Sequence, residues 1–324
     1  MRATDGPRIG VVGAGAIGGW VAAKLALSGQ AVNVLARGET LDALRADGLR
    51  LTQEESTAVA KVRASDDPAE LGPQDVLVIA VKAPALPGLA PALGPMIGPE
   101  TLIVPMLNGV PWWFVPGEPL PSVDPEGGIS LAFPTDQLIG CVVHASSRRA
   151  APNHIIVNHA DKLIIGEPAG GEPSDRLARL FAIFDQAGLR PDLTGDVRRA
   201  IWYKLWGNAT INPLSALTRS TADQLLGEPA VRALILEAMA ELAAIGAAVG
   251  CPIVESGEDR LAVTAKLGPF KTSMLQDVEA GRAIELEALL GAPREIALRF
   301  GIATPQLDRI YGTTRLMGEN LGLL

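Results

Sequence analysis

Three glycines near the amino terminus have the spacing of a phosphate-binding turn. They follow the apolar residues 9–12 and precede a helical pattern over 20–27, in the run Gly13-Ala14-Gly15-Ala16-Ile17-Gly18. The first glycine permits a tight turn, the second lets the backbone approach a pyrophosphate, and the third lets a helix pack against a strand. The helix that follows then directs its N-terminus toward the phosphates. The run therefore predicts a dinucleotide-binding site.

A cation follows the second apolar run of the chain. Residues 31–36 are Ala-Val-Asn-Val-Leu-Ala, and the next residue is Arg37. A carboxylate at this position would accept hydrogen bonds from a ribose 2′-hydroxyl, whereas a guanidinium pairs with a 2′-phosphate. Arg37 therefore favours NADP(H) over NAD(H) as the cofactor. The alternative is that Arg37 is only a solvated charge at the end of a strand.

A stripe of polar residues recurs every four positions in the second half of the chain. The stripe is Lys204, Asn208 and Asn212, within the mostly apolar segment 201–213. Residues at this spacing share one face of a helix. A buried ammonium or amide is costly unless it is paired, so the stripe must meet a ligand or another polar surface. We expect a cleft between two domains to provide it; the alternative is that these side chains only tie two helices together.

The elements that position these residues indicate two domains. Strand candidates lie at 8–12, 31–36, 75–81 and 101–105, a hairpin at 49–52 and 59–63, and later runs at 139–143, 155–158 and 162–165 are expected to extend the same sheet. After Thr194 the β-branched runs disappear and helical patterns continue to the end. The chain is thus predicted to be α/β, with an N-terminal Rossmann-type dinucleotide-binding domain (1–193) and an all-helical C-terminal domain (194–324).

Composition excludes several classes of function. The 324 residues carry a net charge of −8, which argues against nucleic acid or an anionic membrane as a partner. The two cysteines, Cys141 and Cys251, form no CxxC pair, and the N-terminal residues lack an apolar signal region, so a cytoplasmic location is expected. The three histidines have no partners at metal-ligand spacing, and no metal site is predicted.

Several separated motifs, taken together, resemble the ketopantoate reductase (2-dehydropantoate 2-reductase) family, and the resemblance runs nearly end to end. Their order and spacing are much more specific than the glycine run alone. They are the 13–18 turn, Arg37, Val81-Lys82-Ala83, Asn108-Gly109, the segment Lys204-Leu-Trp-Gly-Asn208-Ala-Thr-Ile-Asn212-Pro213-Leu, and Ser273-Met-Leu-Gln-Asp277 with Glu285 downstream.

The resemblance implies NADPH-dependent reduction of 2-dehydropantoate to (R)-pantoate in pantothenate synthesis. Lys204 would be the general acid that protonates the C2 carbonyl as hydride arrives, and Glu285 would lie near the nicotinamide and orient the lysine. Residues matching substrate-binding positions are Asn108, Asn208, Asn212 and Ser273. Residues matching cofactor-binding positions are Gly13, Ala14, Gly15, Ala16, Ile17, Gly18, Arg37, Lys82, Asn108, Ser146 and Glu285.

The separation of Ser273 and Glu285 requires a break in the helix between them. Twelve residues of straight helix would set them about 18 Å apart, too far for one small substrate. Gly281-Arg282 offers a helix stop, so we expect Glu285 to begin a new helix that folds back toward the cleft. An exposed carboxylate at a helix start is the alternative for Glu285.

Two departures from the family pattern leave other functions open. The segment 111–137 is long and irregular, and its residues Trp112, Trp113 and Phe114 could roof a substrate pocket or pack as a satellite core. Ala222 stands near a position at which some relatives carry a substrate-binding asparagine. One alternative is therefore a reductase of another small 2-oxo acid, and a second is a non-catalytic NADP(H)-binding sensor. A homodimer built on the helical domain is a further hypothesis.

Overall fold

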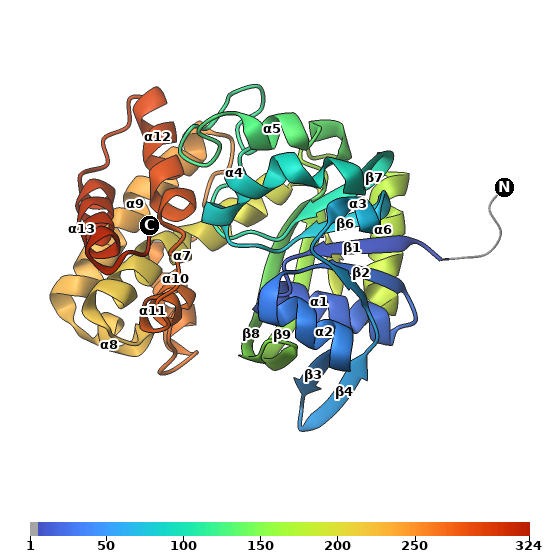
Figure 1. The fold of residues 1–324 in the computed structure, drawn as a ribbon. Coiled ribbons are helices and arrows are strands. Elements are labelled where there is room, and N and C mark those ends of the chain that lie inside the picture. The colour runs from blue at the N-terminus through green and yellow to red at the C-terminus, as the bar shows by residue number, and fades with distance from the viewer. Residues whose placement is uncertain (1–5) are drawn as a thin grey trace. The chain divides into compact units, whose positions relative to one another are not determined.

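The computed structural model describes residues 6–324, which divide into two compact units (Figure 1). Unit 1 contains residues 6–81 together with Gly88–Leu107 and Gly128–Val197. Unit 2 contains Lys82–Pro87, Asn108–Gly127 and Arg198–Leu324. Two short segments from the first half of the chain therefore belong to the helical unit, and they carry Lys82 and Asn108.

A five-stranded parallel sheet forms the centre of unit 1. Its strands, in spatial order, are β5 (Arg63–Ser65), β2 (Ala31–Leu35), β1 (Arg8–Val12), β6 (Gln74–Ile79) and β7 (Ile97–Pro105). Counted along this sheet alone, the order is 3-2-1-4-5, which is typical of Rossmann folds. The predicted strands at 8–12, 31–36, 75–81 and 101–105 are confirmed. The order reverses between β1 and β6, and ligands of such folds bind at the carboxyl ends of the strands there.

The prediction that the later strands extend this sheet is wrong, because they build a second sheet. Its order is β10 (Pro191–Leu193), β9 (His154–Gly166), β3 (Leu49–Gln53) and β4 (Ser56–Ala60), and β8 (Gly140–Ala151) pairs antiparallel with β9. The runs 155–158 and 162–165 are parts of one strand. A two-stranded hairpin such as β3–β4 is marginal alone in water, and parallel pairing with β9 supplies the neighbour it lacks.

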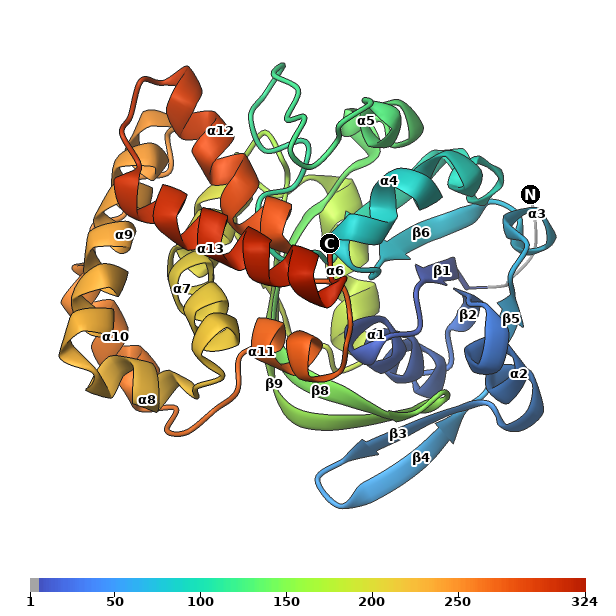
Figure 2. The same cartoon turned by 60° about the vertical axis from the view of Figure 1, so that its left-hand side comes forward.

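Helix α1 (Ala16–Leu27) explains why the second sheet forms. It contacts β1 and β2 of the first sheet and also β3, β4, β8 and β9 of the second, which lie below it in Figure 2. A helix that is apolar all round needs cover on every side. Helix α1 packs closely on both sides. A Cβ on Gly18 would lie 2.0 Å from the carbonyl oxygen of Gly13, in the turn after β1, and a Cβ on Gly19 would lie 2.7 Å from Ile155 in β9.

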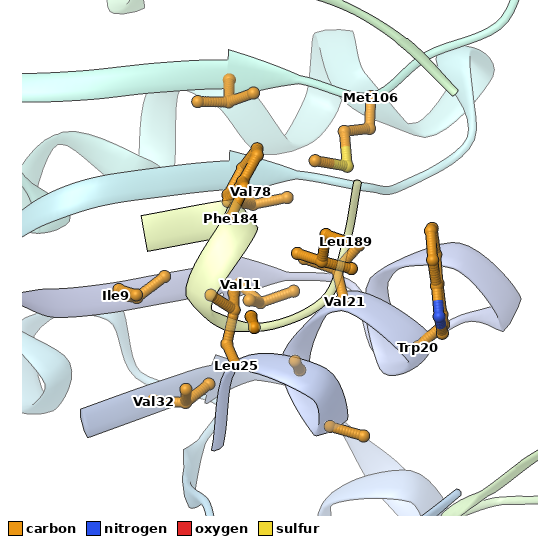
Figure 3. Close-up of a cluster of buried hydrophobic side chains, with 14 of the residues drawn as sticks. Ile9, Val11, Trp20, Val21, Leu25, Val32, Val78, Met106, Phe184 and Leu189 are labelled. Carbon is orange, nitrogen blue, oxygen red and sulfur yellow. The ribbon is translucent and has the colours of Figure 1, made fainter. Parts of the chain in front are cut away.

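A hydrophobic core fixes α1 against the first sheet (Figure 3). It also includes α6 (Asp175–Gln186), which begins where the Ser174 hydroxyl accepts from Leu177 N. Side chains that are essentially fully buried here are Ile9, Val11, Trp20, Val21, Leu25, Val78, Phe184 and Leu189. Because this core holds β1 and α1 rigidly, the turn between them has a fixed geometry.

The remaining helical elements of the first half are short apart from α2. They are α2 (Gly38–Asp47), α3 (Pro68–Leu71), α4 (Leu86–Leu89) and α5 (Gly128–Ala132), with 3₁₀ turns at Ala83–Ala85, Ala90–Met96 and Thr135–Gln137. The predicted loop 111–137 is thus irregular only in its first part. Residues 128–137 return to unit 1 as α5 and a 3₁₀ turn.

Unit 2 is helical from residue 198 to the end of the chain. Its helices are α7 (Val197–Thr218), α8 (Ala222–Gly227), α9 (Pro229–Ala248), α10 (Gly257–Ala265), α11 (Ser273–Glu279), α12 (Ala292–Arg299) and α13 (Pro305–Leu321). On α7, Trp202 and Trp206 donate their indole N–H groups to carbonyls of α9 at 3.0 and 2.8 Å. Lys204 is offset by two residues from each tryptophan and therefore lies on the other side of α7.

Within residues 6–324 the structure offers neither a membrane span nor a metal site. No helix in this range has both the length and the apolar composition needed to cross a bilayer. No group of three His, Cys, Asp or Glu side chains in it is placed to hold a metal ion. Cys141 and Cys251 are both buried and form no disulfide there.

Candidate active site

The glycine run forms an open turn between β1 and α1. Gly13 has a φ of +93°, and a Cβ there would lie 2.8 Å from Val81 Cγ1. Gly15 is the N-cap of α1, and a Cβ there would meet nothing within 4 Å. In the described chain no side chain caps α1, so its first N–H groups are left for an external acceptor. Space, backbone donors and a helix N-terminus together fit the pyrophosphate of a dinucleotide.

Arg37 lies at the carboxyl end of β2, next to β1, and begins α2 as its N-cap. Its side chain is exposed, and within residues 6–324 it forms no hydrogen bond or ion pair. In a Rossmann fold this is the place where the adenosine ribose is recognised. Ser146, the other predicted cofactor residue far from the glycine run, is exposed on β8, and Asn158 lies at hydrogen-bond distance from its hydroxyl.

In unit 2, Lys204 lies at one end of a chain of hydrogen bonds. Its Nζ donates to Asn108 Oδ1 at 3.0 Å, and Asn108 Nδ2 donates to Glu285 Oε2 at 3.3 Å. The other carboxylate oxygen of Glu285 accepts from Ala83 N at 3.3 Å. Because Glu285 takes a hydrogen from the Asn108 amide, the amide oxygen is turned toward the lysine. Glu285 is thus linked to Lys204 through Asn108.

Burial dominates the electrostatics of Glu285. Glu285 is only 8% exposed, which rules out the alternative of an exposed carboxylate at this position. Desolvation raises the pKa of Glu285, although the charge of Lys82 and the hydrogen bonds from Ala83 and Asn108 act in the opposite direction. A carboxyl group with a pKa raised by burial, surrounded by other ionisable groups, is common in functional sites.

The predicted helix break before Glu285 is confirmed. Helix α11 ends at Glu279, Gly281 has a φ of +63°, and the next helical residue is Leu286. A π-helical turn, Glu287–Gly291, then leads into α12. Turns of this type are rare and often occur at functional sites.

Gly109 brings Asn108 to this turn. It has a φ of +83°, and a Cβ there would lie 2.3 Å from the carbonyl oxygen of Ala288. The same carbonyl accepts a hydrogen bond from Val110 N at 2.8 Å. The chain after Asn108 therefore lies directly against the π-helical turn, and this close approach requires a glycine.

A second group of charges surrounds Lys82. Its ammonium forms an ion pair with Asp277 and donates to the Ala283 carbonyl at 3.2 Å. Asp277, 6% exposed, also accepts from Arg282 Nε at 3.1 Å. The sequence motifs predicted no role for Asp277. The signal that could have identified it is its position four residues after Ser273, which puts both on one face of α11.

Two members of the polar stripe on α7, Asn212 and Asn208, differ in their hydrogen bonding. Asn212 is buried and lies 3.4 Å from the Ser273 hydroxyl, to which its amide donates, so it joins α7 to α11 as the alternative interpretation expects. Asn208 is half-buried, and its side chain makes no hydrogen bond to any residue in the range 6–324. The stripe therefore ties two helices together at one end and keeps an amide available in its middle.

These contacts involve seven residues of unit 2, and Asn208 lies beside them on the α7 face that carries Lys204 and Asn212. We call the eight residues together the polar ring. It passes from α7 through Asn108 and Glu285 to Lys82, and through α11 back to α7. Its members are Lys82, Asn108, Lys204, Asn208, Asn212, Ser273, Asp277 and Glu285. All the predicted catalytic and substrate-binding residues are brought together in it. Of the predicted cofactor residues, it contains Lys82, Asn108 and Glu285, while the glycine run, Arg37 and Ser146 belong to unit 1.

The aromatic residues after Asn108 are buried inside unit 2. Phe114 stacks on Trp202 with ring centroids 5.5 Å apart, and the Arg198 guanidinium lies 5.1 Å from the centre of the Phe114 ring. Arg198 Nε also donates to the Phe114 carbonyl at 2.8 Å. Trp112 and Trp113 are buried as well. These contacts favour the satellite-core interpretation of this segment.

Comparison with known proteins identifies the family. Residues 9–170 match the family model described as ketopantoate reductase PanE/ApbA, and residues 196–318 match its C-terminal counterpart. A 2-dehydropantoate 2-reductase from Mesorhizobium japonicum is 38% identical over 97% of this chain and 99% of its own. A structure described as a ketopantoate reductase from Ralstonia solanacearum is 50% identical, with a TM-score of 0.95 over 98% of this chain and 99% of its own. That of 2-dehydropantoate 2-reductase from Methylococcus capsulatus is 30% identical, with a TM-score of 0.84 over 97% of both chains. The chain therefore belongs to the ketopantoate reductase family and is an oxidoreductase.

Proposed function

We propose that this enzyme reduces 2-dehydropantoate to (R)-pantoate with NADPH, a step of pantothenate synthesis. The observation that carries the proposal is the polar ring, in which an ammonium, four amide and hydroxyl side chains and a buried carboxyl group lie within one unit. The choice of 2-dehydropantoate as the substrate is supported by the relatives from Mesorhizobium japonicum and Methylococcus capsulatus, which are named 2-dehydropantoate 2-reductases.

NADPH would be held by residues of unit 1 and, when bound, would supply the hydride. The open space at Gly15 and the uncapped start of α1 suit the pyrophosphate, and Arg37 suits the 2′-phosphate. Lys82, Asn108 and Glu285 would lie toward the nicotinamide. Hydride transfer needs the nicotinamide and C2 of the substrate in contact, so turnover requires both units, whereas binding of the adenosine part requires only unit 1.

Lys204 would stabilise the charge that develops on the substrate. As hydride adds to C2, negative charge accumulates on the carbonyl oxygen, and a positioned ammonium can hydrogen-bond to this oxygen and then protonate it. Asn108 holds the ammonium at 3.0 Å, and Glu285 holds Asn108. The lysine would therefore meet the substrate in one orientation.

The amides of α7 and the hydroxyl of α11 would bind the remaining polar groups of the substrate. 2-Dehydropantoate carries a carboxylate and a hydroxyl group besides its carbonyl. Asn208 has no protein partner in the described chain, and Ser273 is an exposed residue whose hydroxyl can still donate a hydrogen bond, so both have capacity for such groups. The proposal also includes a cytoplasmic location. It further includes a homodimer formed through unit 2, and sedimentation of the purified protein would test whether the protein is a dimer.

A reductase of another small 2-oxo acid is the second candidate. Ala222, at the start of α8, is buried and has no polar side chain, where some relatives were expected to carry a substrate-binding asparagine. This difference removes one expected contact to the substrate. It leaves the groups proposed for the chemistry unchanged.

The test is NADPH oxidation by the purified enzyme with 2-dehydropantoate and with a panel of branched and unbranched 2-oxo acids, repeated with NADH. We expect the highest kcat/KM with 2-dehydropantoate and NADPH. A higher value with another 2-oxo acid would favour the second candidate. Binding of NADPH without turnover of any substrate would favour the sensor, and equal use of NADH would contradict the role of Arg37.

A further inference from the structure

Strand β8 contacts the first turns of both helices that would surround the adenosine phosphates. The Ser147 hydroxyl donates to the carbonyl of Ala16, the first residue of α1, at 2.8 Å. Arg149 Nη1 donates to the hydroxyl of Thr40, in the first turn of α2, at 3.3 Å. All these residues belong to unit 1. A single strand thus extends from the glycine turn to the start of α2.

The register of β8 and β9 determines which side chains face the helices. Ser147 and Arg149 are two residues apart and share one face of the sheet. Arg149 is paired with Ile155, whose side chain packs against α1 at Gly19. The residue between them, Arg148, is paired with Ile156 and lies on the opposite face. The pairing is regular from 147 to 149, so the two arginines differ in the face that they occupy.

Arg149 and Arg37 place two guanidinium groups at the start of α2. Arg37 is its N-cap, and Thr40, which holds Arg149, is one turn further along. Both arginines are exposed, and neither forms an ion pair with any residue in the range 6–324, Glu39 of the same helix turn included. Two cations at a helix N-terminus, with no carboxylate paired to either, suit a group with two negative charges.

We propose that Arg149 is a second arginine for the 2′-phosphate of NADP(H) and sets the preference of this enzyme for NADP(H) over NAD(H). The inference rests on the proposed function, because it assumes that the cofactor lies over the glycine run and reaches Arg37. The hydrogen bond to Thr40 uses one of the five N–H donors of the guanidinium. The other four remain for the phosphate oxygens, and Thr40 fixes the direction in which they point.

A purely structural role is the competing explanation. In that case Arg149 only fastens β8 to α2, and its loss would weaken binding of NADP⁺ and NAD⁺ equally. The two cofactors differ only in the 2′-phosphate, so their comparison isolates the proposed contact. Calorimetric titration with NADP⁺ and with NAD⁺, in the absence of substrate, measures it without turnover.

We expect Arg149→Ala to weaken NADP⁺ binding by about tenfold or more, and NAD⁺ binding by less than about threefold. Arg149→Lys would restore part of the loss, since a lysine keeps the charge but not the planar fork. Arg148→Ala is the matched control because it removes the same charge from the other face, and both affinities are expected to stay near wild type. The effect of Arg149→Ala is expected to shrink at high salt.

Thr40→Ala separates the structural role of Arg149 from phosphate binding. It removes the hydrogen bond between β8 and α2 but keeps the guanidinium group. We expect it to weaken NADP⁺ binding less than Arg149→Ala does. Equal losses for NADP⁺ and NAD⁺ in Arg149→Ala, or no loss in either, would overturn the inference. If the wild type prefers NADP⁺ and Arg37→Ala removes this preference while Arg149→Ala does not, the inference fails and the proposed cofactor stands. If the wild type shows no preference, both fail.

Discussion

The glycine turn and the polar ring are two sites built in opposite ways. The turn consists of six consecutive residues, and its shape depends on side chains that are absent at Gly13 and Gly18, while the absent side chain at Gly15 leaves open space. The polar ring takes residues from four separate segments of the chain, and its shape depends on partners that are present. An added methyl group should therefore damage the first site, and a removed partner the second.

This difference also separates the roles that we propose. Backbone donors and open space bind a phosphate without requiring a titratable group. Stabilisation of an alkoxide requires a cation held in one position, and the ring provides it through consecutive hydrogen bonds. Variants of the two sites test this distinction.

Gly18→Ala and Gly15→Ala form a matched pair within the turn. A Cβ at Gly18 would lie 2.0 Å from the Gly13 carbonyl oxygen, whereas one at Gly15 would enter open space. We expect Gly18→Ala to lower the free energy of unfolding by about 1–3 kcal/mol or more, because backbone must move. Gly15→Ala should change stability by less than about 1 kcal/mol and still weaken NADP⁺ binding. Urea denaturation and calorimetry measure both; equal stabilities would contradict the packing argument.

Asp277→Ala removes a partner from the ring. It leaves the half-buried Lys82 ammonium without its carboxylate, so we expect a loss of about 1–3 kcal/mol in the free energy of unfolding. Arg282→Ala is the control, because Arg282 pairs with the same carboxylate but is 53% exposed in its side chain. Its loss should cost less than about 1 kcal/mol. Similar losses in the two variants would show that burial of the Lys82 pair has no effect on stability.

Glu285→Gln tests the raised pKa. A carboxyl group whose pKa is higher in the folded than in the unfolded protein binds more protons when folded, so its contribution to stability declines as pH rises between those two values. We expect Glu285→Gln to gain stability relative to wild type as pH rises upward from the ordinary glutamate value of about 4.3. Urea titrations at a series of pH values measure this, and parallel curves for the two proteins would contradict the assignment.

Asn208→Ala should have the smallest effect on folding. Its side chain has no hydrogen-bond partner within the described chain, so the free energy of unfolding is expected to change by less than about 0.5 kcal/mol. We expect KM for the 2-oxo acid to rise by about tenfold, because a hydrogen bond to the substrate is lost. Asn212→Ala is the comparison, since it also breaks the contact with Ser273 and should lower stability. A normal KM for Asn208→Ala would remove Asn208 from the substrate site.

The two regions also differ in how well the sequence predicted them. The turn follows from consecutive residues, and the strand before it and the helix after it lie where the pattern indicated. The second sheet was missed because the pairing of β9 with β3 depends on contacts between segments about a hundred residues apart in the sequence, such as Leu51 and Ile155. The apolar character of α1 on every side was the available signal, since such a helix needs a second layer to cover it.

The polar ring was only partly predictable for the same reason. The spacing of Lys204, Asn208 and Asn212 indicated a shared helix face, and the resemblance to a known family added Asn108 and Glu285. The role of Asp277 depends on Lys82, which is far away in the sequence and reaches it only through the fold. The hydrogen bonds that direct the Asn108 amide toward Lys204 depend on three separate segments.

The central claim is that the glycine turn binds the cofactor and that the polar ring carries out the chemical step. The variant Lys204→Ala tests this claim. The NADP⁺ dissociation constant and the turnover of 2-dehydropantoate would be measured on the same preparation, beside wild type. We predict that the dissociation constant stays within about threefold of wild type while kcat falls by roughly 10²–10⁴-fold, the usual contribution of a general acid. Turnover close to wild type would contradict the assignment of the chemistry to the polar ring.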